Sequence, residues 1–360
     1  MTNLALPTLQ DISNPAFTAK LQHKIDNKTK PQGSLGQLEA LALQLGQILG
    51  TESPQLEQPQ MLVFAGDHGL TARGVSAFPS DVTWQMVENF LAGGACVSVL
   101  ANANGIALNV VDCGVNHAFL DATQTPRAGL LTYKIANGTA DSSTAAAMTA
   151  AQCQQAIENG MAIVKNLPGN VVLVGEMGIG NTSAASLILS RLTGLDIAEC
   201  TGAGTGLDSA GVDRKTAVLR DVLAFHTGVN AGVNAGVIAP LDVMAAFGGF
   251  EMATMLGAVL QAAAERRVIV VDGFITTAVI LVAHALQPAV LQRCVFAHRS
   301  GERGHGLMLD TLNAKPLLDM GLRLGEGSGA ALAWPLLVAA CTVLRDMASF
   351  ESAGVSEKSV

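Results

Sequence analysis

The sequence predicts an α/β fold, in which helices flank a parallel sheet and a smaller helical domain is formed from both ends of the chain. Five short apolar runs each end in a polar or glycine-rich turn, and alanine-rich segments of helical character separate them. This alternation is typical of a parallel sheet with right-handed crossovers. Hydrophobic residues make up 49% of the chain and aromatic residues only 4%, so small aliphatic side chains supply the apolar mass, as in sheets buried on both faces.

The first 58 residues carry helix signals. Apolar side chains recur there at helical spacing, namely Leu35, Leu38, Leu41, Leu45 and Ile48. Residues 30–39 (KPQGSLGQLE) predict a loop and cap that open this helix, because proline and glycine break what precedes it. Pro54 and Pro59 mark a linker at residues 51–60. We therefore assign residues 1–58 to the small helical domain.

The middle of the chain carries the strand signals. The five apolar runs predict strands at residues 61–65, 107–111, 171–174, 268–271 and 294–297. In a parallel sheet the turns that follow these strands share one edge, and open α/β sheets bind their ligands at that edge. We therefore assign residues 59–304 to a large α/β domain with nucleotide-binding loops. Helix signals return afterwards, so residues 305–360 are assigned to the small domain.

Composition excludes several classes of protein. The net charge of −8, without any stretch rich in lysine or arginine, argues against a nucleic-acid surface. Apolar stretches are interrupted before they reach the ~20 residues of a membrane span, and no secretory signal pattern is present. The six cysteines lack metal or CxxC spacing, and residues 66–69 (GDHG) have no second ligand cluster. We expect a soluble, cytoplasmic protein without a metal site.

Glu326 stands between two glycines, just before an apolar run that predicts a helix. Backbone can approach a ligand closely there, because glycine lacks a Cβ and tolerates positive φ. One interpretation is therefore a catalytic base. The other is structural: an acidic residue at a helix start, with Ser328 as the N-cap, where a negative charge favours the helix dipole. The local sequence leaves both open.

Two glycine-rich turns are candidate phosphate sites. Residues 175–182 (GEMGIGNT) come close to a P-loop, but Asn181 replaces the lysine that would reach a triphosphate. Such a turn can bind one phosphate at a helix N-terminus, or it can serve only tight packing between strand and helix. Residues 201–208 precede a helix with Arg214 and Lys215, which either complete a phosphate site or form a solvated helix face.

Taken together, these stretches resemble the family of nicotinate-nucleotide:dimethylbenzimidazole phosphoribosyltransferases. The matching pieces follow one another in order between residues 30 and 335, and each is weak alone. They are residues 30–39, 66–69 with 74–76, 82–83 with 85–86, 175–182, 202–208, 248–251, 298–300 and 322–327.

The resemblance implies a Rossmann-like large domain, a small helical domain built from both chain ends, and a homodimer. It implies transfer of the 5-phosphoribosyl group of nicotinate mononucleotide to 5,6-dimethylbenzimidazole, which gives α-ribazole 5′-phosphate and nicotinate. A β-nucleotide that gives an α-product implies inversion at C1′ by direct displacement. The benzimidazole must lose its N–H proton as it attacks, so one general base is required, and the resemblance makes this base a glutamate. No cofactor and no metal are expected.

The resemblance also assigns residues to roles. Glu326 is expected to be the general base, and Glu176 a second active-site carboxylate. The residues expected on the nucleotide and phosphate side are Gly178, Gly204, Lys215, Ser300 and Gly325. The residues expected beside the benzimidazole are Phe78, Gln85 and Leu324.

Two alternatives to this function stay open. One is a phosphoribosyltransferase on the same scaffold that uses adenine, a phenol or another benzimidazole. The other is a non-catalytic nucleotide-binding protein, which would keep the glycine loops and lose the carboxylates. Glu176 and Glu326 are both present, which weighs against the second alternative.

Overall fold

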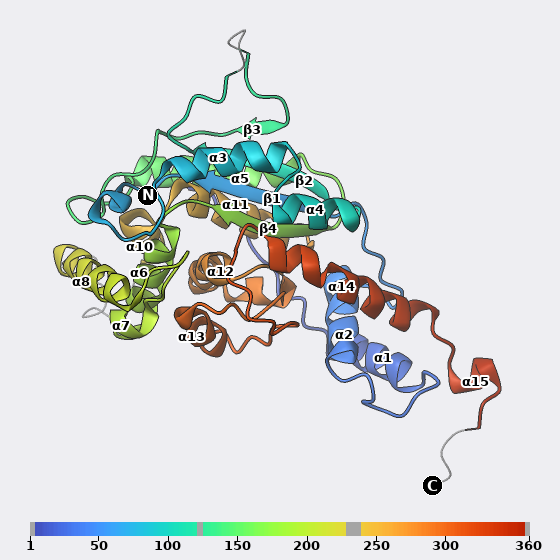
Figure 1. Cartoon of the computed structure of the whole chain (residues 1–360). Coiled ribbons are helices and arrows are strands. Elements are labelled where there is room, and N and C mark those ends of the chain that lie inside the picture. Colours follow the sequence, from blue (N-terminus) through green and yellow to red (C-terminus); the bar gives the residue numbers. More distant parts are fainter. Residues whose placement is uncertain (1–3, 121–124, 228–238, 357–360) are drawn as a thin grey trace.

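The computed structural model describes residues 4–120, 125–227 and 239–356. Its centre is a six-stranded, fully parallel sheet in the order β3-β2-β1-β4-β5-β6 (Figure 1). The strands are β1 (Gln60–Gly66), β2 (Ala107–Gly114), β3 (Leu130–Thr132), β4 (Val171–Met177), β5 (Val268–Val271) and β6 (Cys294–Phe296). β1 pairs with β2 on one side and with β4 on the other, so the strand order reverses there. Ligands bind beyond the carboxyl ends of such a sheet.

The α/β fold predicted from the sequence is confirmed, and all five predicted strands are present. The sequence missed β3, which pairs with β2 at the edge of the sheet. Its three residues are only partly buried or exposed, so the strand leaves no apolar run in the sequence. By contrast, every residue of β1, β4, β5 and β6 is buried.

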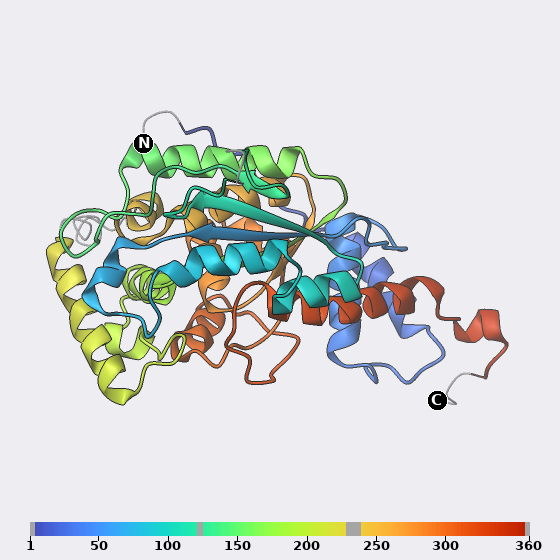
Figure 2. The same ribbon diagram turned by 45° about the horizontal axis from the view of Figure 1, so that its top comes forward.

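Alternate residues of the strands feed two hydrophobic cores, one on each face of the sheet. Leu62 and Phe64 of β1 belong to one core, whereas Met61 and Val63 belong to the other. The helices of the first core are α5 (Ala150–Lys165), α6 (Asn181–Thr193), α7 (Ile197–Cys200), α8 (Ser209–Phe225), α10 (Pro240–Phe247), α11 (Phe250–Ala264), α12 (Phe274–Leu286) and α13 (Arg303–Thr311). Figure 2 shows the sheet between α5 on one side and the helices of the second core on the other.

The second core joins the two ends of the chain. Its helices are α1 (Pro15–Asp26), α2 (Gln37–Leu49), α3 (Asp81–Leu91), α4 (Cys96–Ala103) and α14 (Ser328–Asp346). α14 packs against α2, α4 and β4, and α1 packs against α2. The amide of Thr29 donates to the carbonyl of Ala348, just before the short helix α15 (Phe350–Ala353) (Figure 1). Both chain ends therefore meet, while the domain boundaries at residues 58 and 305 stay a prediction.

Two 3-10 helices complete the described elements. They are η1 (Gly69–Arg73), which follows β1, and η3 (Pro288–Arg293), which precedes β6.

Two helical stretches in the described part of the chain, Asp81–Ala103 and Ser328–Asp346, are long and apolar enough to cross a membrane. The second is α14, whose Leu337 and Leu344 lie in the core beneath the sheet. The first consists of two helices, α3 and α4, separated by a turn at Gly93 and Gly94. Both stretches contribute buried side chains to the second core, and these buried residues pack on that face of the sheet.

Candidate active site

One cavity lies at the carboxyl edge of the sheet, where the turns after β4, β5 and β6 meet the loop before α14. Its lining includes Glu176, Asp272, His298 and Glu326. The register explains why they converge: Val174 pairs with Val271, which in turn pairs with Phe296, so the three strands end at the same level. Three of the five predicted polar turns therefore share this site, and those after β1 and β2 do not line it.

Glu326 has a strained backbone. Its φ is +67°, in the left-handed region, and its neighbours Gly325 (+82°) and Gly327 (+89°) are left-handed as well. Such a conformation costs a non-glycine residue about 1–3 kcal/mol and is found mainly where function requires it. The flanking glycines seen in the sequence thus belong to a turn of three left-handed residues, with Glu326 at its centre.

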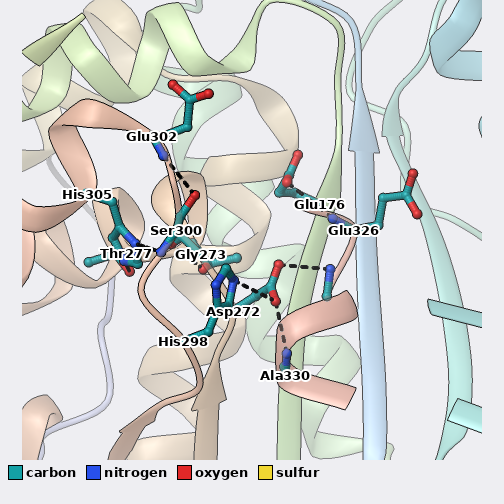
Figure 3. A network of polar contacts seen from close by, with 12 residues as sticks. Glu176, Asp272, Gly273, Thr277, His298, Ser300, Glu302, His305, Glu326 and Ala330 are labelled. Atoms are coloured by element: carbon teal, nitrogen blue, oxygen red, sulfur yellow. Dashed lines mark hydrogen bonds and ion pairs between the residues drawn. The ribbon is translucent and has the colours of Figure 1, made fainter. Parts of the chain in front are cut away.

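The helix start after this turn is capped from a distant strand. Gly327 is the N-cap of α14 and Ser328 is its first residue, so Ser328 does not take the N-cap position. Asp272, directly after β5, accepts hydrogen bonds from the amides of Gly327 (3.1 Å) and Ala330 (2.9 Å) (Figure 3). The carboxylate at the helix N-terminus is therefore that of Asp272. Within the described part of the chain, the Glu326 carboxylate accepts no hydrogen bond and stays available for a ligand.

Burial decides the pKa of the two glutamates. Burial, with the charge of Asp272 in addition, raises the pKa of Glu326 to about 7. Burial also raises the pKa of Glu176 to about 8, helped by Asp272 and Glu251 and opposed by a hydrogen bond from Asn181. At neutral pH, Glu326 is therefore close to half ionised and Glu176 is mostly protonated. The ionised form of Glu326 can accept a proton in a reaction near pH 7.

Four of the five predicted nucleotide and phosphate residues line the cavity, and Gly325 lies beside Glu176 and Glu326. Gly178, Gly204, Ser300 and Gly325 line it. Lys215 is 1% exposed and lies just behind the lining, where its Nζ donates to Thr182 Oγ1 at 2.8 Å. Burial lowers the pKa of Lys215 to about 8, against the charge of Glu302.

Glu302 is the carboxylate beside Lys215, Gly204 and Ser300, a group of residues called the phosphate corner below. Its Oε2 accepts from the amide of Gly204 (3.3 Å), and its own amide donates to Ser300 Oγ (3.2 Å). Arg214, the second cation predicted here, is exposed and forms the solvated helix face that was the alternative. One buried cation beside two glycine turns suits a single phosphate group.

The predicted benzimidazole residues are only partly brought to the cavity. Leu324 lines it and is 55% exposed. Phe78 and Gln85 are exposed and lie outside the lining. Helix α3, which carries Gln85, still reaches the cavity, because Thr83 Oγ1 accepts a hydrogen bond from the amide of Ile179 (3.1 Å). The roles of Phe78 and Gln85 stay predictions.

A buried histidine network that extends from the cavity lining was not predicted (Figure 3). His298 Nε2 lies 3.6 Å from Asp272 Oδ1. His305 Nδ1 accepts from the amide of Ser300 (2.8 Å), and its Nε2 lies 3.0 Å from Thr277 Oγ1. Burial lowers the pKa of His305 to about 3, so this ring is neutral. The network was missed because Asp272 and Thr277 are distant in sequence from His298 and His305. The available signal was the polar residue directly after β5 and the one soon after β6.

A buried ion pair supports the turn after β4. His68, after β1, places Nε2 at 2.7 Å from Glu251 Oε1 of α11. Burial opposes a charge on His68, but the carboxylates of Glu251, Asp67 and Glu176 outweigh it and raise the His68 pKa. The ring packs against Gly178, where a Cβ would lie 3.4 Å from Nε2. The turn after β1 thus shapes the cavity wall without lining it.

Comparison with known proteins gives a consistent set of relatives. A family model described as phosphoribosyltransferase matches residues 11–355. The nicotinate-nucleotide–dimethylbenzimidazole phosphoribosyltransferase of Variovorax paradoxus (strain S110) is 64% identical over 357 residues, which is 99% of each chain. The protein of the same name from Dechloromonas aromatica (strain RCB) is 55% identical and covers 96% of this chain and 98% of its own. The crystal structure of CobT from Thermus thermophilus is 38% identical, has a TM-score of 0.89 and covers 96% of this chain and all of its own.

The pKa of Glu326 predicts a gain in stability for Glu326→Gln that depends on pH. The folded chain keeps the Glu326 proton up to about pH 7, whereas an exposed glutamate releases it near 4.5. Raising the pH through this window therefore destabilises the wild type, by about 3 kcal/mol at most. Glutamine cannot ionise, so we expect the variant to exceed the wild type in Tm at pH 8 by more than at pH 5.

Differential scanning calorimetry at the two pH values measures this difference. Glu57→Gln, a change at an exposed side chain, serves as the matched control and should show no comparable gain. A Tm difference between Glu326→Gln and the wild type that is the same at pH 5 and pH 8 would contradict the raised pKa.

Proposed function

This chain belongs to the family of nicotinate-nucleotide–dimethylbenzimidazole phosphoribosyltransferases, and on this premise we propose that it transfers the 5-phosphoribosyl group of nicotinate mononucleotide to 5,6-dimethylbenzimidazole. The products are α-ribazole 5′-phosphate and nicotinate. The observation that carries the proposal is Glu326: a buried carboxylate without a hydrogen-bond partner in the described chain, held in a strained turn of the cavity.

The chemistry requires one proton acceptor. The bond from C1′ to the pyridine nitrogen breaks, and a bond from C1′ to a benzimidazole nitrogen forms. Nicotinate leaves with a neutral ring nitrogen, so the leaving group needs little acid assistance. The benzimidazole loses the proton of its other nitrogen, and a base within hydrogen-bond reach accepts it. We assign this role to Glu326, whose pKa of about 7 suits proton transfer near neutral pH.

Inversion at C1′ requires the two bases on opposite faces of the ribose. In Figure 3, Glu176 lies between the pair Ser300 and Glu302 on one side and the Glu326 carboxylate on the other. The proposed phosphate corner and the proposed base thus occupy different ends of one site. This arrangement supports a direct displacement in which positioning provides much of the acceleration, because aligned reactants avoid an entropic cost of about 7–11 kcal/mol.

The nucleotide end of the site suits a monophosphate. Helix α6 begins at Asn181 beside the cavity, and no side chain among the described residues caps its N-terminus. The amides of Asn181 and Ser183 donate to the carbonyls of Gly178 and Gly180, so the dipole of α6 and the buried Lys215 supply the attraction for an anion here. We assign Gly178, Gly204, Lys215 and Ser300 to this end, and Glu176 to the centre of the site. Gly325, which lies beside Glu176, is assigned to the nucleotide as well, and Phe78, Gln85 and Leu324 are assigned to the benzimidazole.

We further propose that the protein acts in the cytoplasm as a homodimer. The family resemblance in the sequence supports the dimer, and Phe78 and Gln85 are exposed in the single chain, where a second subunit can cover them. Neither substrate requires a metal or a cofactor for the displacement.

The proposal predicts that the wild type releases nicotinate only when a suitable base is present. The rate constant kcat/KM should rise with pH and reach half its maximum near pH 7, where Glu326 loses its proton. Glu326→Gln should lower kcat by roughly 10²- to 10⁴-fold, the contribution of a general base. The Kd for nicotinate mononucleotide should stay unchanged, because the nucleotide binds at the other end of the site.

Chromatographic detection of nicotinate and calorimetric binding measure these quantities. Adenine, p-cresol and unsubstituted benzimidazole compete in the same assay and report which base the site prefers. Absence of nicotinate release with every base would overturn the proposed activity, whereas a Glu326→Gln variant as active as the wild type would remove only Glu326 from the base role.

Lys215→Met should weaken nucleotide binding. A charge-assisted hydrogen bond contributes about 1.5–3 kcal/mol, so we expect KM for nicotinate mononucleotide to rise roughly tenfold or more. Because burial lowers the pKa of Lys215 to about 8, its charge is lost above that value, and the wild-type KM should also rise above pH 8. Arg214→Met, at the neighbouring exposed cation, is the matched control and should leave KM unchanged. A Lys215→Met variant with wild-type KM contradicts the assignment.

A further inference from the structure

We propose that Asp272 is the positioning residue for Glu326: its carboxylate fixes the turn that carries Glu326 and adds a negative charge to the surroundings of Glu326. The inference rests on the proposed function, because it takes Glu326 as the proton acceptor. Asp272 is 2% exposed and lies at the boundary between β5 and the cavity.

Both oxygens of Asp272 are used to hold α14. Oδ2 accepts from the amide of Gly327, the residue after Glu326, and Oδ1 accepts from the amide of Ala330 one turn further on (Figure 3). The first amides of a helix have no partner within the helix, and the helix dipole favours a negative charge beside them. A buried carboxylate is therefore well compensated here. The same two bonds fix the direction in which the chain enters α14.

The turn needs such an anchor because its backbone is strained and closely packed. Glu326 is left-handed, and its carbonyl lies against Gly175 of β4, where a Cβ would be only 2.4 Å from the carbonyl oxygen. On the other side a Cβ on Gly329 would lie 2.0 Å from Cδ2 of His298. The N-terminus of α14 is thus wedged between β4 and the turn after β6, and Asp272 after β5 bonds it in place. A looser turn would let Glu326 move out of the position for proton transfer.

Asp272 also adds a like charge to the surroundings of Glu326. The other charged or titratable groups that line the cavity are Glu176 from β4, His298 after β6, Glu302 before α13, and Arg323 from the Glu326 loop itself. After burial, the charge of Asp272 is the cause that raises the pKa of Glu326. Removing this charge should lower the pKa, because a nearby like charge disfavours ionisation.

Two variants separate the geometric role from the electrostatic one. Asp272→Asn keeps the shape, removes the charge and turns one acceptor into a donor that faces an amide. We expect kcat to fall roughly tenfold or more, and the half-point of the acid limb of kcat/KM to move to lower pH by roughly half a unit or more. Asp272→Glu keeps the charge but displaces both bonds, so kcat should fall while the half-point stays near pH 7.

Both variants are measured as full-length protein, with nicotinate mononucleotide binding and Tm as checks of folding. An Asp272→Asn variant with wild-type kcat, or with a lowered kcat and an unmoved half-point, overturns the inference, since a merely structural role lowers the rate without moving the profile. If Asp272→Asn does not fold, wild-type kcat in Asp272→Glu overturns the positioning role and a lowered kcat supports it. A wild type without an acid limb contradicts the proposed function of Glu326 instead, so the two failures are distinguishable.

Discussion

The site depends on how the first turn of α14 is held at the carboxyl edge of the sheet. Three strands contribute: Gly175 of β4 leaves room for the Glu326 backbone, Asp272 after β5 accepts two amides, and His298 after β6 packs against Gly329. These strands end at the same level because their register is continuous. α14 itself buries its apolar side against α2, α4 and the sheet, so the core on that face and the site share one helix. Packing far from the cavity therefore also positions Glu326.

Two opposing effects act on the Glu326 carboxyl. A helix N-terminus typically favours a charge by about 0.3–1 kcal/mol, whereas burial can raise a carboxyl pKa by as much as 3–5 units. Asp272 occupies the free amides of α14, so the helix stabilises Asp272 and burial prevails at Glu326. Burial also brings Glu176 and Lys215 to pKa values of about 8. Glu326, the proposed base, and Lys215, the proposed phosphate cation, therefore both change charge close to neutral pH. Glu326 is mostly ionised and Lys215 mostly protonated only in a narrow pH range between about 7 and 8.

Much of the fold could be predicted from the sequence, because strands buried on both faces leave apolar runs and their turns share one edge. β3 could not, since an edge strand of three partly exposed residues leaves no such run. Glu326 and Lys215 were candidates because of the glycines near them, and the family resemblance gave them roles that stay predictions. Asp272 was not a candidate: its partners lie 55 and 58 residues away, and no local pattern announces such bonds. For the same reason, local sequence suggested Ser328 as the cap of α14. Phe78 and Gln85 remain predictions, because a single chain leaves them exposed.

Where the acceptor base binds decides whether Glu326 is the proton acceptor. A crystal structure of the Glu326→Gln variant with both nicotinate mononucleotide and 5,6-dimethylbenzimidazole bound would show which atom lies nearest residue 326. We expect the protonated benzimidazole nitrogen within about 3 Å of the side chain at residue 326, with the other nitrogen facing C1′ of the ribose. A benzimidazole bound with its N–H away from residue 326, toward Glu176 or solvent, would contradict it.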